Sequence, residues 1–194
     1  MNEARERLAN LIKKSLEINE KELSRFLDKW QPFSLQSGEF LVKAGGIDPY
    51  FYFVIQGVQK LYFIDKKGEE HILGFSFEGS FSGDFQSFLY QEKSEFYVES
   101  ISPSSFLRIN HEDWQRSFEQ TPLLYQWYSE FLKDILFGRI KREIEMQSCS
   151  AEERFEAFMK RAPKPLLQIP QKYLASYLGM SPETFSRMRA KRIS

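Results

Sequence analysis

A carboxylate and a guanidinium stand one helical turn apart near the end of the chain, at Glu183 and Arg187. Residues four apart share a face of an α-helix. In that arrangement Arg187 can donate two hydrogen bonds to guanine O6 and N7, and Glu183 can accept one from cytosine N4 or brace the arginine. This pair therefore favours the reading of base edges in the major groove of DNA.

Shorter polar groups and further basic residues surround this pair. Hydroxyl and amide groups near helix starts suit contacts to phosphate oxygens. Basic residues beyond them add affinity that does not depend on sequence. The candidate DNA-contacting residues are Gln171, Ser181, Pro182, Glu183, Thr184, Ser186, Arg187, Arg189 and Lys191.

Two short helices with a tight turn between them are predicted to position these groups, within residues 169–192. Leu174 and Leu178 lie one turn apart on the first helix, and Gly179 follows where a helix can end in the left-handed region. Ser181 has the chemistry of an N-cap, and Pro182 suits the first helical position. The pattern predicts a helix-turn-helix; an ordinary helical hairpin in a core is the alternative.

Charge along the chain agrees with a polyanionic partner. Residues 148–194 contain nine Lys and Arg residues against four Glu, so this segment is near +5. The whole chain is neutral, and the first 147 residues are therefore near −5. A basic segment after an acidic one suggests a polyanion at the C-terminal end, although a solvated basic end would look the same.

The preceding residues change their hydrophobic period twice. Helical spacing over residues 3–29 gives way to short alternating runs at 40–42, 50–55, 58–64, 71–77, 96–101 and 106–109. Residues 84–90 interrupt these runs as a short helix. Short, closely spaced strands predict an antiparallel barrel or sandwich, and hence an α+β protein.

A helix over about residues 122–147 carries more apolar side chains than one face can hold. One face can cover the β-structure, and the other needs a partner, for which a second copy of the chain is the simplest choice. Burial within one domain is the alternative. The candidate dimerisation residues are Leu124, Tyr128, Phe131, Ile135 and Gly138.

Several functions are disfavoured by composition and by missing patterns. No run of 18 apolar residues predicts a membrane span, and the charged N-terminus does not resemble a signal peptide. The single cysteine, Cys149, cannot form an internal disulfide, so we expect a cytoplasmic protein. Neither a catalytic constellation, a phosphate-binding Gly loop nor a metal-ligand spacing is evident, so an enzyme or a metalloprotein is not expected. His71 and His111 are weak candidates for haem ligands, and Asp48, Glu69, Glu70, Glu92 and Glu95 are interpreted as solvated loop charges.

The order of these parts resembles the Crp/Fnr family of bacterial transcription regulators over essentially the whole chain. Residues 179–187 (GMSPETFSR) are similar to that family's recognition-helix signature, residues 52–58 to a strand pair of its β-roll, and Gly83-Asp84-Phe85 to the start of its phosphate cassette. The resemblance implies a β-roll sensor domain over residues 1–120, a dimerisation helix over 121–147 and a DNA-binding domain over 148–194. It also implies a homodimer on palindromic double-stranded DNA, with RNA polymerase as a partner and no membrane association.

Two departures from the family pattern matter. Where cyclic-nucleotide-binding members have an Arg-Ser/Thr pair that neutralises the cyclic phosphate, this chain has Ser94-Glu95. We therefore expect neither cyclic AMP nor cyclic GMP to bind at the weakly supported pocket set Gly83, Asp84, Phe85, Ser94 and Glu95. The second departure is that the sequence stops at Ser194, so we expect a shortened wing after the recognition helix.

Two questions stay open at this level. The β-roll could bind an unidentified small, apolar or uncharged effector, or it could serve dimerisation alone, and no cofactor is predicted. The whole chain could instead be a signalling or partner-binding module with a vestigial helix-turn-helix. Glu183 and Arg187 favour the regulator, because a vestigial helix has no need of both residues on one face.

Overall fold

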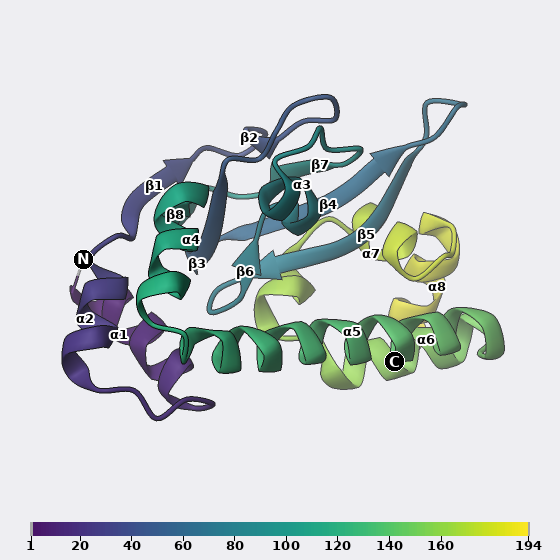
Figure 1. Ribbon diagram of the computed structural model, residues 1–194. Coiled ribbons are helices and arrows are strands. Elements are labelled where there is room, and N and C mark those ends of the chain that lie inside the picture. The colour runs from purple at the N-terminus through teal and green to yellow at the C-terminus, as the bar shows by residue number, and fades with distance from the viewer. Residues whose placement is uncertain (1, 194) are drawn as a thin grey trace.

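Two antiparallel sheets form a β-roll at the centre of the molecule, with helices from both ends of the chain packed around it (Figure 1). The structure, a computed structural model, describes residues 2–193. One sheet has the order β1-β8-β3-β6 and the other β2-β7-β4-β5. The strands are β1 (Gln31–Leu35), β2 (Phe40–Val42), β3 (Tyr50–Gln56), β4 (Val58–Ile64), β5 (Glu70–Phe77), β6 (Phe81–Ser82), β7 (Tyr97–Ser100) and β8 (Ser104–Asn110).

Helices account for most of the remaining chain. They are α1 (Asn2–Lys13), α2 (Glu20–Leu27), α3 (Phe85–Tyr90), α4 (His111–Gln120), α5 (Leu124–Ser148), α6 (Ala151–Arg161), the 3₁₀ helix η1 (Lys164–Gln168), α7 (Gln171–Tyr177) and α8 (Pro182–Ile193). None of the helices within residues 2–193 is both long and apolar enough to cross a lipid bilayer. The predicted α+β fold with a β-roll is confirmed, whereas β1, β6 and α4 were not predicted.

Strand β3 is buried on both of its sides, because alternate side chains of a strand point to opposite faces. Phe51 and Phe53 pack into the core that the helices share with the sheet. Tyr52 and Val54 belong to a separate cluster with Leu35 of β1 and Phe106 of β8. Strand β3 therefore packs against the helices with one face and against the interior of the β-roll with the other.

Aromatic side chains build the core between the β-roll and helices α1, α2, α4 and α5. Trp30 and Trp127 are at most 2% exposed. The ring of Phe26 meets both edge-on, at centroid distances of 5.8 Å and 6.0 Å. Truncation of one such ring to alanine costs about 3–5 kcal/mol, so this cluster dominates the stability of the N-terminal part.

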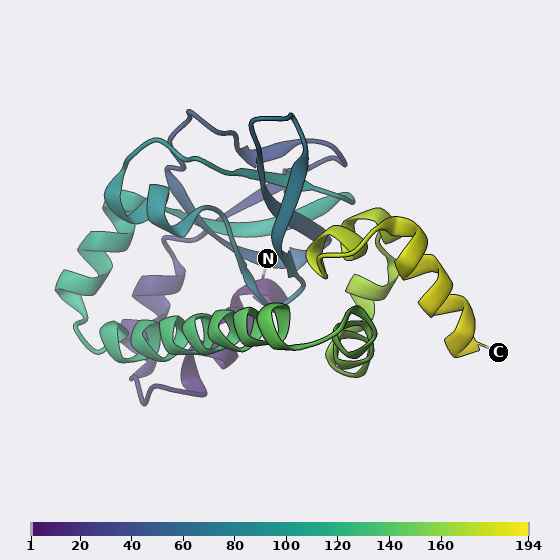
Figure 2. The same ribbon diagram turned by 90° about the vertical axis from the view of Figure 1, so that its right-hand side faces the viewer.

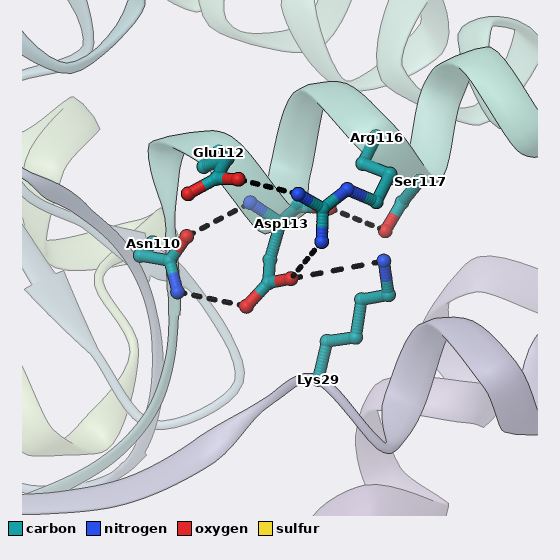
Figure 3. Close-up of polar contacts among 6 residues, drawn as sticks. All are labelled: Lys29, Asn110, Glu112, Asp113, Arg116 and Ser117. Carbon is teal, nitrogen blue, oxygen red and sulfur yellow. Dashed lines mark hydrogen bonds and ion pairs between the residues drawn. The ribbon is translucent and has the colours of Figure 1, made fainter.

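Helix α4 is fixed at its start by a polar network around Asp113 (Figure 3). Asn110 caps the helix by accepting a hydrogen bond from the Asp113 amide at 2.8 Å, and its own side-chain amide donates to the Asp113 carboxylate at 2.8 Å. Lys29, at the corner between α2 and β1, lies 3.8 Å from the same carboxylate. Arg116 pairs with Glu112 and lies 3.9 Å from Asp113. These contacts tie the helix start to a segment about 80 residues earlier.

Helix α5 runs along the base of the β-roll (Figure 1) and departs from the predicted face of self-association. Leu124 is fully buried, and Tyr128 and Phe131 pack on the protomer's own aromatic core. Leu124 therefore cannot contact a partner, which corrects that part of the prediction. Beyond Phe131, the large apolar residues of α5 that are left at least 39% exposed are Leu132, Leu136, Phe137, Ile140 and Ile144.

The C-terminal helices form a second core and lie beside strand β5, as Figures 1 and 2 both show. Phe155, Phe158 and Phe185 are buried in this core, which also includes Val58 of β4. Ser150 and Glu153 form the predicted capping box at the start of α6. The helix-turn-helix is thus docked on the β-roll, with α8 extending away from it (Figure 2).

Candidate DNA-reading helix and effector cavity

The turn between α7 and α8 has the geometry that the sequence predicted. Gly179 has φ +64°, and Met180 N–H donates to the Ala175 carbonyl at 3.0 Å, which closes the end of α7 as a Schellman motif does. A Cβ at residue 179 would lie 2.4 Å from Met146 Cε of α5. Glycine is therefore favoured by the left-handed backbone conformation, whereas the Met146 methyl group is the end of a flexible side chain that could move aside.

Ser181 caps α8 by accepting a hydrogen bond from the Thr184 amide at 3.2 Å. Phe185 is 1% exposed and meets the Phe155 ring at 5.3 Å, so it fixes the inner face of the helix. Glu183, Ser186 and Arg187 are exposed on α8. Hydrogen bonds from its own backbone amide and from Ser181 lower the pKa of Glu183, so its carboxylate is charged near neutral pH.

The other predicted DNA-contacting residues are spread around this helix. Pro182 and Lys191 are exposed, while Thr184 and Arg189 are half-buried on the same helix. Gln171 is half-buried as the first residue of α7. The neighbouring Arg192 lies 3.5 Å from Glu156 of α6.

Arg154 of α6 positions the turn and was not singled out from the sequence. Its guanidinium donates to the carbonyl groups of Leu178 at 2.9 Å, Gly179 at 3.3 Å and Cys149 at 2.6 Å. It therefore satisfies carbonyls at the end of α7, where a helix leaves them unpaired. Nothing in the local sequence distinguishes this arginine from a solvated one, because its partners lie up to 25 residues away.

A cavity of about 770 Å³ opens between the β-roll, α5 and the end of α7. Gly83, Asp84 and Phe85 line it, as expected if the cavity is the effector pocket. These three residues, which resemble the start of the family's phosphate cassette, are called the cassette turn below. Ser94 is buried and does not line the cavity; its hydroxyl donates to the Asp84 carboxylate at 2.6 Å. Glu95 is exposed and also lies outside the lining.

Asp48 is fully buried beneath the cassette turn, which corrects its interpretation as a solvated charge. Its carboxylate accepts hydrogen bonds from the Asp84 amide at 2.9 Å and the Tyr50 amide at 3.4 Å. Burial raises the pKa of Asp48 to about 7, and the nearby charge of Asp84 acts in the same direction. Gly83 has φ +112°, and a Cβ there would lie 2.9 Å from this carboxylate. A larger residue at position 83 would therefore clash with the buried acid.

Neither histidine lines the cavity, which disfavours the haem-ligand reading. His111 begins α4 and meets Phe88 edge-on, whereas His71 stacks on Phe63 and lies 2.9 Å from Asp65. Asp65, Glu69 and His71 bring one potential metal-ligating atom each within 4.8 Å of one another. Asp65 accepts hydrogen bonds from the amides of Lys67 and Glu69, so its carboxylate closes the β4–β5 hairpin.

Comparison with known proteins agrees with this architecture. A family model described as the cyclic nucleotide-binding domain matches residues 32–121. The chain is 25% identical over 181 residues to the nitrogen fixation regulation protein FixK of Bradyrhizobium diazoefficiens, covering 88% of this chain and 75% of FixK. It is 25% identical over 185 residues to the fumarate and nitrate reduction regulatory protein of Escherichia coli, covering 88% of this chain and 72% of that protein. The structure of the c-di-GMP responsive global regulator CLP of Xanthomonas campestris has a similar fold, with a TM-score of 0.71 at 17% identity over 89% of this chain and 91% of CLP.

A β-roll of the cyclic-nucleotide-binding type, joined through a long helix to a helix-turn-helix, is the architecture of a class of transcription regulators. Such regulators are not enzymes. This chain is similar to regulators of the Crp/Fnr family in its sequence and in its architecture.

Proposed function

We propose that this regulator acts as a homodimer, reads a palindromic DNA site with α8, and is not controlled by cyclic AMP or cyclic GMP. The observation that carries the proposal is the polarity of α8. Glu183, Ser186 and Arg187 are exposed, while Phe185 on the inner face is 1% exposed. A helix with a solvent-facing acid and arginine one turn apart, anchored by a buried aromatic ring, suits insertion into the major groove.

Each of the predicted DNA-contacting groups has a distinct role in this proposal. Arg187 binds guanine, and Glu183 accepts from cytosine N4. The N-terminus of α8 with Ser181 and the hydroxyls of Thr184 and Ser186 faces phosphate groups. Arg189 and Lys191 add affinity without sequence preference, together with Gln171 at the start of α7.

The apolar ridge left on α5 supports the proposed self-association. Leu132, Leu136, Ile140 and Ile144 succeed one another at intervals of four residues, and all are at least 39% exposed. Residues at that interval form the ridges with which helices pack against one another. With Phe137 they give an unpartnered apolar face, which a second copy of α5 covers. Two-fold symmetry then presents two α8 helices about 34 Å apart, one turn of DNA.

Cyclic nucleotides are disfavoured by the charge of the cassette turn. Among residues 83–95, all of which are described, no basic side chain lines the cavity. Asp84 does line it and is only 5% exposed. A cyclic phosphate placed at this turn would meet a carboxylate without a cassette arginine, at a cost of several kcal/mol where the effective dielectric is low. Calorimetry that detects micromolar binding of either nucleotide would contradict this part of the proposal.

Selection of genomic DNA fragments by the purified protein, followed by anisotropy titrations, tests the DNA-reading part. Arg187→Ala should weaken binding to the selected site by about 1–3 kcal/mol and relax specificity at one base pair per half-site. The matched control Arg189→Ala removes a charge from the same helix and should weaken all sequences about equally. If Arg187→Ala bound every sequence as well as the parent, the readout assignment would be wrong. A protein that selected no sequence would instead indicate a vestigial helix-turn-helix.

A further inference from the structure

Two arginines of α5 border the cavity between the β-roll, α5 and the end of α7, and neither is ion-paired with an acid among the described residues. Arg139 and Arg142 both line the cavity, and they are three residues apart, so they are neighbours on the helix surface. Within residues 2–193, neither forms an ion pair with a carboxylate. Partial desolvation lowers the pKa of Arg139, and the positive charge of Arg142 contributes in the same direction. Two guanidinium groups are therefore held close to each other without neutralisation.

Most hydrogen-bond donors of this pair remain available. Arg139 Nη1 donates to the Leu73 carbonyl at 2.7 Å, and Arg142 Nη2 donates to the Tyr177 carbonyl at 2.7 Å. Arg142 Nε is buried and has no hydrogen-bond acceptor within the described residues. A guanidinium has five N–H donors in a planar fork that matches carboxylate, sulfonate and phosphate oxygens. The backbone carbonyls thus fix the orientation of both groups and leave donors for an anion.

The neighbouring charges do not neutralise the pair. Arg161 also lines the cavity but is bound by both carboxylate oxygens of Glu145. Lys141 adds a further cation to the lining, while the acids that line it are Asp84 of the cassette turn and Asp134 of α5. Basic groups therefore exceed acidic ones around the cavity, and the excess lies on α5 and not on the cassette.

The remaining wall is largely apolar. Leu73, Phe75, Phe85, Val98 and Phe131 line the cavity. Its volume of about 770 Å³ lies within the range typical of small-molecule sites. Such a wall suits an aromatic or aliphatic body better than a ribose, whose hydroxyl groups would lose their hydrogen bonds to water.

We propose that this cavity binds a small organic anion, with its charged group on Arg139 and Arg142 and its apolar body against the β-roll. This proposal replaces the uncharged effector that the sequence suggested, and it moves anion recognition from the cassette turn to α5. Because Arg142 also holds the end of α7 and its guanidinium lies 4.5 Å from the centre of the Tyr177 ring, the ligand contacts a residue that supports the docked helix-turn-helix.

Fluorescence titration of the full chain with two probes tests the proposal. The first probe is 8-anilino-1-naphthalenesulfonate, an apolar ring system with one negative charge. The second is N-phenyl-1-naphthylamine, the same ring system without the sulfonate. Loss of each arginine in Arg139→Gln and Arg142→Gln should weaken the sulfonate about tenfold and leave the neutral probe within about twofold. Lys133→Gln, which removes an exposed α5 cation that pairs with Glu130 outside the cavity, should change neither affinity.

The double variant Arg139→Lys, Arg142→Lys guards against a loss caused by misfolding, because it keeps both charges and should keep most of the sulfonate affinity. If the sulfonate bound equally well to the glutamine variants, the arginines would not be an anion site. If both probes weakened together in the glutamine variants while the lysine variant also failed, the arginines would be structural. Since the readout is ligand binding without DNA, these outcomes are independent of the proposed reading by α8.

Discussion

The ammonium group of Lys60, on β4, lies 4.4 Å from the centre of the Tyr173 ring on α7. Lys60 is only 2% exposed; it forms ion pairs with Glu70 at 2.8 Å and Glu99 at 3.1 Å, and lies 4.2 Å from the Tyr62 ring. The first helix of the helix-turn-helix therefore covers a buried cation of the β-roll. A cation–π contact of this kind is worth about 0.5–2 kcal/mol.

Substitution of this lysine should destabilise the docked state. Lys60→Ala leaves Glu70 and Glu99 without their cation, and removal of one partner of a buried ion pair costs about 3–5 kcal/mol. We expect the lower end, about 3 kcal/mol, because the Glu70 side chain is 43% exposed and can be solvated. Urea unfolding followed by circular dichroism measures the change. Lys66→Ala, at the exposed tip of the β4–β5 hairpin, is the control and should have no measurable effect.

Stability should fall as the pH rises toward neutrality. The folded-state pKa of Asp48 is raised from 3.8 to about 7, so the folded state retains a proton that the unfolded state has lost. Ionisation of Asp48 therefore destabilises the fold progressively between about pH 4 and pH 7, by at most about 4 kcal/mol. Melting temperatures at intervals from pH 5 to pH 8.5 would detect this trend.

Asp48→Asn supplies the control for that pH dependence. Asparagine does not titrate, so the melting temperature of this variant should be nearly constant over the same range. The acids with lowered pKa, including Glu145, Glu153 and Glu183, titrate below the pH 5 at which the measurements begin. A parent protein as insensitive to pH as the variant would show that Asp48 is ionised throughout.

Two serines of the helix-turn-helix should differ in their effect on stability. Ser181→Ala removes the N-cap of α8 and should lower the free energy of unfolding by about 1 kcal/mol. Ser186 is exposed, so Ser186→Ala should leave stability within about 0.5 kcal/mol while weakening DNA binding through a lost phosphate contact. Thermal unfolding and anisotropy titrations on the same preparations check both effects. Equal stability of the two variants would argue against the cap.

An acidic substitution on the exposed face of α5 should prevent self-association. Phe137 is 63% exposed, and Phe137→Glu would place a charge within the proposed helix–helix contact. Sedimentation should then show a monomer where the parent is a dimer, with weaker binding to a palindromic site. Tyr90→Glu, which alters an aromatic residue 71% exposed on α3, should remain dimeric. A Phe137→Glu variant that stayed dimeric would place the interface elsewhere.

The sequence by itself determined the local structure of the helix-turn-helix, because the residues responsible are close together in the chain. Gly179, Ser181 and Pro182 act within a few residues of one another, so local preferences predict the turn and the start of α8, although Arg154 also holds the turn from a distance. The same is true of the Ser150–Glu153 capping box. Helix α4 could have been found by similar means, since Asn110 caps it and Trp114 and Phe118 lie one turn apart.

The features that the sequence did not predict depend on contacts between residues far apart in the chain. Strand β1 contains Pro32 and pairs only at the edge of its sheet with β8, more than 60 residues away, so its local pattern is weak. The burial of Asp48 and the face of α5 that stays exposed likewise depend on which distant segments pack against them. Arg139 and Arg142 look like ordinary surface cations in the sequence. Only the tertiary structure shows that they lie at a cavity and form no ion pair with an acid among the described residues. The physical reason is that a charged group is neutralised by the residues that folding brings next to it, which can lie anywhere in the sequence.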